Sequence, residues 1–431
     1  MSFGFRAVLN PLAQADQTPP DAAAGGGAAG GGAAGGGAAG GGAAGGGAAG
    51  GGAAGEAGSE GSGGAAVLAF HRRLPAYEPT PLLSLPHLAS DLGVRELLVK
   101  VEAGRFGLPA FKLLGASWAT YRALRIRLAE RTARSPDDVL VEWADVHELA
   151  RLVEPLQPLR LAAATDGNHG RAVARMARWL GFDATVFVPA GTTETRIAGI
   201  ESEGATVVVV PGSYDDAVAR AAAEAGERCL VVNDTSGPGD VDVPRWVAEG
   251  YGTMFVEVDE ALARAGRGVP GVALVPIGVG ALAAAAISHF RRGRHPVHVI
   301  GVEPTGAASM TASALAGKPV MVVEPCSIMA GLNCGTPSPV AWPVVSEGAT
   351  GFVTVDDDWA RLAVRTYAAC GIEAGETGAA ALAGLMALLR QGRATPLARH
   401  VGKDASVLVL ATEGASDLVA WRTIVGTQLV G

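Results

Sequence analysis

Short apolar strands alternate with helices along most of this chain, and this order restricts it to one class of fold. Helices are predicted at residues 112–127, 171–180, 193–203, 214–225 and 282–291. Strands are predicted at residues 92–101, 159–165, 184–188, 206–211, 229–233, 272–277, 297–302 and 407–411. Strands joined through helices pair in parallel, and the helices cover both faces of the sheet. We therefore expect an α/β fold of twisted, mostly parallel sheets, with ligands bound at the carboxyl ends of strands.

The amino-terminal part has a different composition. From about residue 22 to residue 66 it contains little besides glycine and alanine, with GGGAA repeated in tandem. Such a segment cannot bury enough apolar surface to offset the entropy of ordering glycine. We expect residues 1–66 to be a disordered leader and residues 67–431 to be folded, with a smaller lobe at about residues 112–245 inserted in a larger one. Residues 135–158, which include Trp143, are expected to be a surface insertion.

Charge and cysteine usage exclude several classes of protein. The formal net charge of -8 argues against nucleic acid or an anionic membrane as the main partner. The four cysteines form no CxxC pair and no Cys/His cluster with zinc spacing, so no metal site is expected. This usage is typical of a reducing cytoplasm. Cys326 and Cys334 are expected to be free thiols, although they are near enough in sequence to pair.

Lys112 is conspicuous because the 431 residues include only three other lysines: Lys100, Lys318 and Lys403. Arginine serves most surface roles as well as lysine does, but its guanidinium stays protonated and cannot form a Schiff base. Lys112 stands between Phe111 and a Leu-Leu-Gly-Ala run, where an apolar helix is predicted to begin. It is either a surface lysine with its stem on apolar neighbours or a reactive amine.

Residues 165–170 (TDGNHG) follow an apolar strand and open a helix. The glycines permit a tight turn, and the amino end of the helix offers unpaired N–H groups to an anion. Asn168 can donate a hydrogen bond to a phenolate-like oxygen, and Asp166 adds a carboxylate that a simple turn does not need. A capped turn, with Asp or Asn as the N-cap, is the competing interpretation.

Residues 276–282 (PIGVGAL) form a second strand-to-helix turn. Its small residues would let the backbone N–H groups of Gly278, Val279, Gly280 and Ala281 converge on a phosphate. A dinucleotide loop is disfavoured, because no glycine stands three residues after Gly280 as the GxGxxG spacing requires. A plain packing turn remains the other possibility.

Two further polar residues follow predicted strands. The hydroxyl of Thr412, after the last strand, could bind a ring nitrogen that is kept neutral. Asp234, in Asn-Asp-Thr, is either a loop or capping acid or a second carboxylate of an active site. A third carboxylate, Glu376, stands at the start of an alanine-rich helix, where a capping role is the simpler interpretation.

Together these segments resemble the fold-type II family of pyridoxal-phosphate enzymes, which includes serine/threonine dehydratases, threonine synthase and the tryptophan synthase β-subunit. That family has a Phe-Lys segment, then Gly-Asn-His, then a glycine-rich phosphate loop, and a late Ser, Thr or Cys. All four occur here in this order, although the phosphate loop reads Gly-Val-Gly-Ala. The resemblance implies two lobes with pyridoxal 5'-phosphate between them. It implies that Lys112 binds the cofactor, together with Phe111, Asn168, Gly278, Val279, Gly280, Ala281 and Thr412.

Within this family, five segments are similar to the ammonia-lyases that act on 2,3-diaminopropionate: residues 79–82, 105–108, 165–170, 250–253 and 328–332. This similarity assigns the distinguishing carboxylate to Asp166 and a second functional carboxylate to Asp234. Such carboxylates suit a substrate with a second amine, because they can bind that amine or exchange a proton with it.

The resemblance thus implies α,β-elimination of 2,3-diaminopropionate to pyruvate and ammonia. Lys112 and Asp166 would be two candidate bases for the Cα proton, and Asp234 would position the leaving amine or transfer a proton to it. His169 is interpreted as structural. The implied partner is a small amino acid, and the family implies a homodimer. Two alternatives are a serine/threonine dehydratase and a non-catalytic regulatory protein that binds a phosphorylated ligand.

Overall fold

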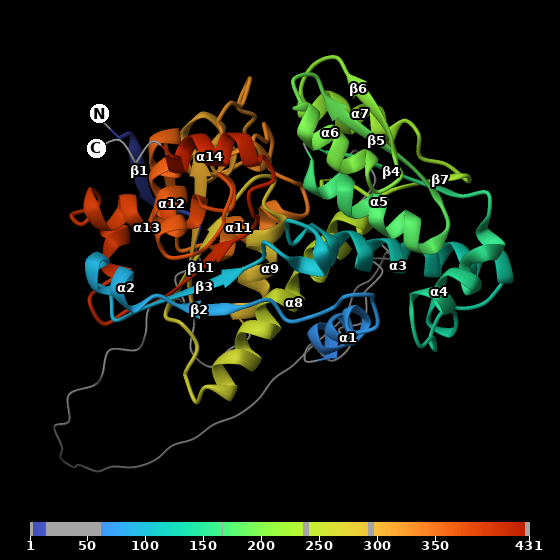
Figure 1. Ribbon diagram of the computed structural model, residues 1–431, viewed down its shortest axis with the longest axis horizontal. Helices are drawn as coiled ribbons and strands as arrows, with labels where there is room; N and C mark the ends of the chain where they lie inside the picture. The colour runs from blue at the N-terminus through green and yellow to red at the C-terminus, as the bar shows by residue number, and fades with distance from the viewer. Residues whose placement is uncertain (1–2, 14–61, 166, 236–240, 292–296, 427–431) are drawn as a thin grey trace, which may run out of the picture.

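Two β-sheets organise the computed structural model of this chain, which describes residues 3–13, 62–165, 167–235, 241–291 and 297–426 (Figure 1). One sheet has seven strands and the other has four. We call the seven-stranded sheet with its helices the large lobe, and the four-stranded sheet with its helices the small lobe. The small lobe is drawn in green at the upper right of Figure 1. The α/β fold expected from the alternation of strands and helices is confirmed.

The large sheet has the strand order β1-β10-β9-β8-β11-β3-β2. Its five central strands pair in parallel, whereas the edge strands β1 and β2 pair antiparallel with β10 and β3. Every residue of β8 and β11 is buried, as expected for strands with helices on both faces. The strands are β1 (Phe5–Leu9), β2 (Leu82–Ser84), β3 (Glu96–Val101), β8 (Val272–Pro276), β9 (His298–Pro304), β10 (Gly351–Val355) and β11 (Ser406–Ala411).

The small sheet is entirely parallel, with the order β6-β5-β4-β7. Alternate residues of β4 point to opposite faces: Leu161 and Ala163 pack with α5, and Ala162 and Ala164 pack with α7. The chain enters this sheet after β3 and returns to the large sheet at β8. The elements are β4 (Arg160–Ala164), β5 (Asp183–Pro189), β6 (Thr206–Val210), β7 (Cys229–Val231), α5 (Asn168–Leu180), α6 (Glu194–Glu201) and α7 (Tyr214–Ala222).

Helices of the large lobe enclose its sheet. α13 is buried along almost its whole length, and its residue Gly384 permits close contact with β9, because a Cβ there would lie 2.6 Å from a methyl carbon of Val302. The other helices outside the small lobe are α2 (Pro86–Leu92), α8 (Asp242–Arg264), α9 (Ala281–Phe290), α10 (Ser309–Ala316), α11 (Ala341–Gly348), α12 (Asp357–Ala369), α13 (Ala380–Arg390) and α14 (Leu418–Gly426), together with α1 (Ser62–His71), which packs on α8 and α3. Among the described residues, no helix is both long enough and apolar enough to cross a membrane.

The contact between α8 and α3 (Lys112–Thr132) fixes the start of α3. Two glycines make this approach possible. A Cβ at Gly250 would lie 2.4 Å from the carbonyl oxygen of Leu114, and a Cβ at Gly115 would lie 2.5 Å from the ring of Tyr251. Both distances are shorter than any normal non-bonded contact, so only glycine fits. Lys112, at the first position of α3, is thereby held against α8.

The expectation that residues 1–66 are disordered throughout is wrong at its two ends. Residues 5–9 form β1, which completes the large sheet by pairing with β10. The Asn10 amide supports this edge by donating hydrogen bonds to the carbonyl oxygens of Ser346 and Ala349, both at 2.8 Å. At the other end, α1 already begins at Ser62. Residues 14–61, which include most of the glycine- and alanine-rich run, lie outside the described residues.

The expectation that residues 135–158 form a surface insertion holds for only part of the segment. They contain α4 (Val146–Val153), whose apolar face is buried against α5. Trp143 is buried as well, and the guanidinium of Arg73 lies 4.0 Å from the centre of its ring. The acids of this segment are exposed, but Trp143 and the apolar residues spaced along α4 belong to the core.

Candidate active site

A cavity between the lobes brings together the residues that the four sequence motifs predict. Lys112 and Asn168 lie at the amino ends of α3 and α5, and Asp234 follows β7. The 278–281 turn and Thr412 reach the same cavity from the ends of β8 and β11. The cavity is about 610 Å³ including its mouth, which suits a small cofactor with a substrate. Parallel sheets therefore gather the site at the carboxyl ends of their strands, as expected.

The amine of Lys112 turns into this cavity. Its Nζ lies 2.8 Å from Oδ2 of Asp234 and 5.3 Å from the centre of the Phe111 ring. The Phe111 ring packs edge-on against Tyr251 of α8. The interpretation of Lys112 as a surface lysine with its amine in water is wrong, because that amine is paired with a buried carboxylate.

Asp234 is held as an anion. Its Oδ1 accepts a hydrogen bond of 3.0 Å from the hydroxyl of Tyr214, and its Oδ2 faces Lys112. Burial alone would raise the pKa of Asp234, but the positive charge of Lys112, aided by His169 and Tyr214, lowers that pKa well below its ordinary value. An ionised carboxylate at this position is suited to hold an ammonium group.

Asn168 is the first residue of α5, and its Nδ2 donates a hydrogen bond to Oε2 of Glu413. The preceding Gly167 has a φ of 154°, which side chains rarely adopt, so the tight turn expected from its sequence is present. The ring of His169 contacts the carbonyl oxygen of Val232 at 2.7 Å. Asp166, the carboxylate predicted in this turn, lies outside the described residues.

The turn after β8 forms a cradle of small residues. Gly280 has a φ of 102° and precedes α9, and a Cβ at Gly278 would lie 3.1 Å from Sγ of Cys334. Side chains larger than hydrogen would crowd this turn at both glycines. The first N–H groups of α9 have no partner within the helix, and the helix dipole adds positive potential there. The turn is thus suited to a phosphate, with Val279 and Ala281 also lining the cavity.

Thr412 presents a polar atom to the same cavity. Its Oγ1 is buried and has no hydrogen-bond partner among the described residues. Its carbonyl oxygen accepts a hydrogen bond of 3.4 Å from the backbone N–H of Phe111, which joins the end of β11 to the start of α3. Buried hydroxyls are normally paired, so this one is suited to a ligand atom.

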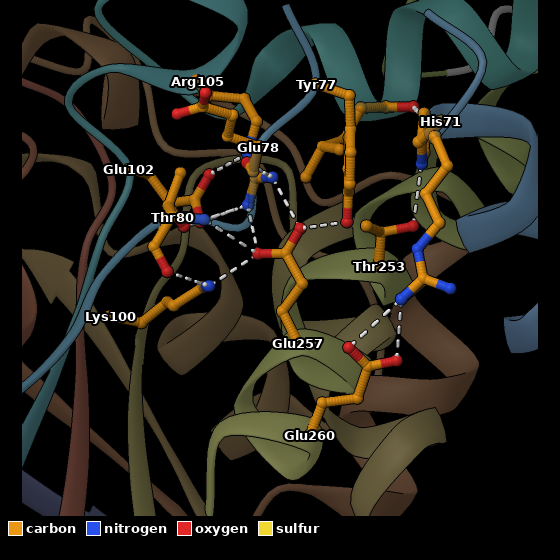
Figure 2. A network of polar contacts seen from close by, with 12 residues as sticks. His71, Tyr77, Glu78, Thr80, Lys100, Glu102, Arg105, Thr253, Glu257 and Glu260 are labelled. Carbon is orange, nitrogen blue, oxygen red and sulfur yellow. Dashed lines mark hydrogen bonds and ion pairs between the residues drawn. The ribbon is translucent and has the colours of Figure 1, made fainter. Parts of the chain in front are cut away.

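A buried cluster of charges, shown in Figure 2, fixes the segment that leads to Lys112. Arg105 lies between two carboxylates: it donates to Glu102 at 2.8 Å and to Glu257 of α8 at 2.6 Å. Lys100 of β3 donates to Glu257 at 2.6 Å. All four side chains are essentially inaccessible to solvent, and their two positive and two negative charges balance. This cluster was not predicted from the sequence.

Backbone bonds connect the cluster to the cavity. The N–H of Glu102 donates to the carbonyl oxygen of Ala411 at 2.8 Å, and the N–H of Gly414 donates to the carbonyl oxygen of Pro109 at 2.8 Å. Ala110 and Glu413 form an isolated antiparallel bridge. The segment between Arg105 and Lys112 is therefore tied to the end of β11 as well as to α8.

Several residues of the cavity were not predicted to be site residues. Glu413, Thr377 and Cys334 line it, and Tyr214 contacts Asp234. Glu413 could have been suspected because it follows Thr412 at a strand end, and Thr377 because it follows Glu376 near the start of a helix, but Cys334 carries no distinctive local pattern. Cys334 and Cys326 are both free thiols, as expected. The described residues contain no group of His, Cys, Asp and Glu that could hold a metal ion.

These features fit a phosphate-bearing pyridine aldehyde. The glycine cradle suits its phosphate, the Thr412 hydroxyl suits its ring nitrogen, and the amine of Lys112 suits its carbonyl carbon. Asn168 adds a hydrogen-bond donor at the cavity wall. The cavity therefore has a complementary group for each reactive part of pyridoxal phosphate.

Comparison with known proteins also supports a site for pyridoxal phosphate. Residues 73–413 match the family model described as pyridoxal-phosphate dependent enzyme. The chain is 33% identical to the diaminopropionate ammonia-lyase of Salmonella typhimurium over 386 residues, which cover 85% of this chain and 92% of that protein. It is 34% identical to that of Escherichia coli over 369 residues, which cover 83% and 89%. An L-threonine ammonia-lyase of Geobacter sulfurreducens is 32% identical over 204 residues, 47% of each chain.

A solved structure is similar along the whole chain. It is the diaminopropionate ammonia-lyase of Escherichia coli in complex with an aminoacrylate-PLP azomethine reaction intermediate. The two chains share 30% sequence identity and a TM-score of 0.78, and the match covers 99% of this chain and 98% of that chain. The same enzyme in complex with D-serine matches with a TM-score of 0.79 and 29% identity, at the same coverage.

Proposed function

This chain belongs to the pyridoxal-phosphate dependent enzyme family, and from that premise we propose that it converts 2,3-diaminopropionate to pyruvate and ammonia by α,β-elimination. The observation that carries the proposal is the Lys112–Asp234 pair, which places an amine and an ionised carboxylate together in a cavity with a phosphate cradle. Relatives that match most of this chain are named diaminopropionate ammonia-lyases.

The cofactor would be held by the residues that line the cavity. Lys112 would bind it through Nζ, with the ring of Phe111 beside the amine. The backbone N–H groups of residues 278–281 would receive the phosphate, Asn168 would donate to the ring oxygen, and the Thr412 hydroxyl would meet the ring nitrogen. Bound pyridoxal phosphate stabilises negative charge at the Cα of an amino acid joined to it.

Proton transfer at Cα would be carried out by this chain's own groups. Lys112 would accept the proton at Nζ. Asp166 would accept it at a carboxylate oxygen, and two bases at different places would allow both enantiomers to react. The sequence supports this role for Asp166, because a turn after a strand does not otherwise require a carboxylate beside an anion site.

Asp234 would bind the second amine of the substrate. Lys112 can accept a proton only when its amine is neutral, and Asp234 then lacks a cationic partner while its carboxylate stays buried beside Tyr214. A substrate β-ammonium group restores the missing charge, since a buried carboxylate is strongly destabilised without a cation or hydrogen-bond donors. A serine or threonine hydroxyl cannot supply that charge, and this difference favours diaminopropionate over hydroxy amino acids.

The chain is further proposed to act in the cytoplasm as a homodimer, with a small amino acid as its substrate and neither nucleic acid nor membrane as a partner. Its scattered cysteines and its net charge of -8 support the location and the expected lack of polyanionic partners. The dimer is what the family implies. Light scattering coupled to size-exclusion chromatography would test it, and a mass equal to one chain would exclude it.

The stoichiometry of the products tests the proposed reaction. Elimination followed by hydrolysis converts one 2,3-diaminopropionate and one water into one pyruvate and two ammonia. Serine or threonine elimination releases one ammonia for each oxo acid. We expect pyruvate and ammonia in a one-to-two ratio from diaminopropionate, with much slower release from serine and threonine. Comparable kcat/KM values for serine or threonine would instead support a dehydratase.

A further inference from the structure

Glu413 is a carboxylate of the cavity that the proposed reaction does not use. It follows Thr412 at the end of β11 and is only 3% exposed. Its Oε2 accepts a hydrogen bond from Nδ2 of Asn168. Asn168 begins α5 in the small lobe and Glu413 belongs to the large lobe, so this bond crosses between the lobes.

The backbone of Glu413 is fixed by close packing. A Cβ at Gly378 would lie 2.1 Å from the carbonyl oxygen of Glu413, so the two backbones touch at a distance that only glycine permits. The N–H of Gly375 donates to that same oxygen at 3.2 Å. On the other side, the bridge to Ala110 ties Glu413 to the segment that carries Lys112. The backbone that carries the Glu413 carboxylate is therefore held in one position.

We propose that Glu413 is a positioning residue that fixes the amide of Asn168 for the cofactor, an inference that rests on the proposed function. A carboxylate only accepts hydrogen bonds, so an amide facing it must present Nδ2 and not Oδ1. That nitrogen carries two hydrogens. One is directed to Glu413, and the other is left to donate to an oxygen of the cofactor at the cavity wall.

Loss of the Glu413 carboxylate removes the contact that selects one of the two orientations of the Asn168 amide. The amide of Asn168 can then turn over, which would present its own oxygen to the cofactor oxygen and replace a hydrogen bond by a repulsion. A hydrogen bond to a charged group contributes enough binding free energy to change a dissociation constant on the order of tenfold. The effect of Glu413 on the dissociation constant of pyridoxal phosphate should therefore depend entirely on the presence of Asn168.

A double-mutant cycle tests this dependence. The dissociation constant of pyridoxal phosphate and the absorption maximum of the bound cofactor are measured for the wild type, Glu413→Ala, Asn168→Ala and the double variant. Each single variant should weaken binding about tenfold and shift the absorption maximum in the same direction. The double variant should be no weaker than Asn168→Ala, because residues that act through one another are not additive.

Two further variants separate positioning from folding. Glu413→Gln keeps an acceptor oxygen but adds a donor, so it should restore only part of the affinity. Glu376→Gln removes a carboxylate from the neighbouring loop, outside the cavity lining, and should leave binding unchanged. Additive losses in the cycle, or an unaltered dissociation constant and absorption maximum in Glu413→Ala, would overturn the inference and leave the proposed function intact. A wild-type protein that does not bind pyridoxal phosphate would overturn both.

Discussion

Nζ of Lys112 and Oδ2 of Asp234 lie 2.8 Å apart, although 122 residues separate them in the chain. The lysine begins a helix that packs against the large lobe, and the aspartate follows a strand of the small lobe. Their contact therefore depends on the arrangement of both lobes. We expect it to couple the amine to substrate binding as well, because a neutral Lys112 amine leaves the buried Asp234 carboxylate in need of another cation.

Replacing Asp234 by asparagine should damage the reaction of diaminopropionate selectively. The amide that replaces the carboxylate is neutral, so the β-ammonium group loses its partner, and kcat/KM for diaminopropionate should fall by roughly a hundredfold to ten-thousandfold. Any slow reaction of serine should fall much less. Steady-state kinetics on both amino acids measure the difference, and an equal loss for the two would show that Asp234 does not recognise the second amine.

Asp166 should act on one enantiomer of diaminopropionate more than on the other. If it is the base for one enantiomer and Lys112 for the other, Asp166→Ala should lower kcat for one by roughly a hundredfold and for the other far less. Rates of pyruvate release from the separate D and L isomers test this. Asp137→Ala, which removes an exposed carboxylate elsewhere, serves as the control. Unchanged rates for both isomers would contradict the role of Asp166.

Arg105→Ala should strongly destabilise the fold. The variant leaves the negative charges of Glu102 and Glu257 buried with only the positive charge of Lys100 near them. Removing one partner of a buried ion pair costs about 3–5 kcal/mol of folding free energy. Arg72→Ala breaks an exposed pair with Glu260 and should cost no more than about 1 kcal/mol. Urea unfolding of the two variants beside the wild type measures both changes. Equal, small changes would mean that the buried cluster does not stabilise the segment before Lys112.

The same cluster should make stability fall in acid. Burial opposes ionisation of Glu257, but Arg105 and Lys100 outweigh it and lower the pKa of Glu257 to about 2 from an ordinary 4.5. The folded state thus binds this proton more weakly than the unfolded state. The contribution is present above pH 4.5 and is lost as the pH falls toward 2. Between pH 6 and pH 3, the unfolding free energy of Glu257→Gln should decline less steeply than that of the wild type. Parallel curves of unfolding free energy against pH for the two proteins would contradict this.

The site could largely be predicted because its residues stand where strands end. Lys112, Asn168, Asp234, Thr412 and the 278–281 turn each occur next to a recognisable strand or helix boundary. Parallel sheets bring such boundaries to one edge, so local patterns were sufficient to place these residues in a common cavity.

Partners that are distant in sequence could not be predicted in this way. Arg105 meets Glu257 across 152 residues, and Asn168 meets Glu413 across 245. Glu257 does not differ locally from a surface acid, and the position of Glu413 after a strand does not reveal its partner. Strand β1 was missed for the same reason, because its five residues become a strand only by pairing with β10 at the far end of the chain.

The central claim is that Lys112 is the residue that binds the cofactor, and the scarcity of lysine makes it directly testable. The protein loaded with pyridoxal phosphate is reduced with borohydride and digested, and the peptides are analysed by mass spectrometry. The phosphopyridoxyl mass should be found on Lys112, and Lys112→Ala should show neither the adduct nor the visible absorption band. An adduct on Lys100, Lys318 or Lys403 in place of Lys112, or no adduct at all, would contradict the account.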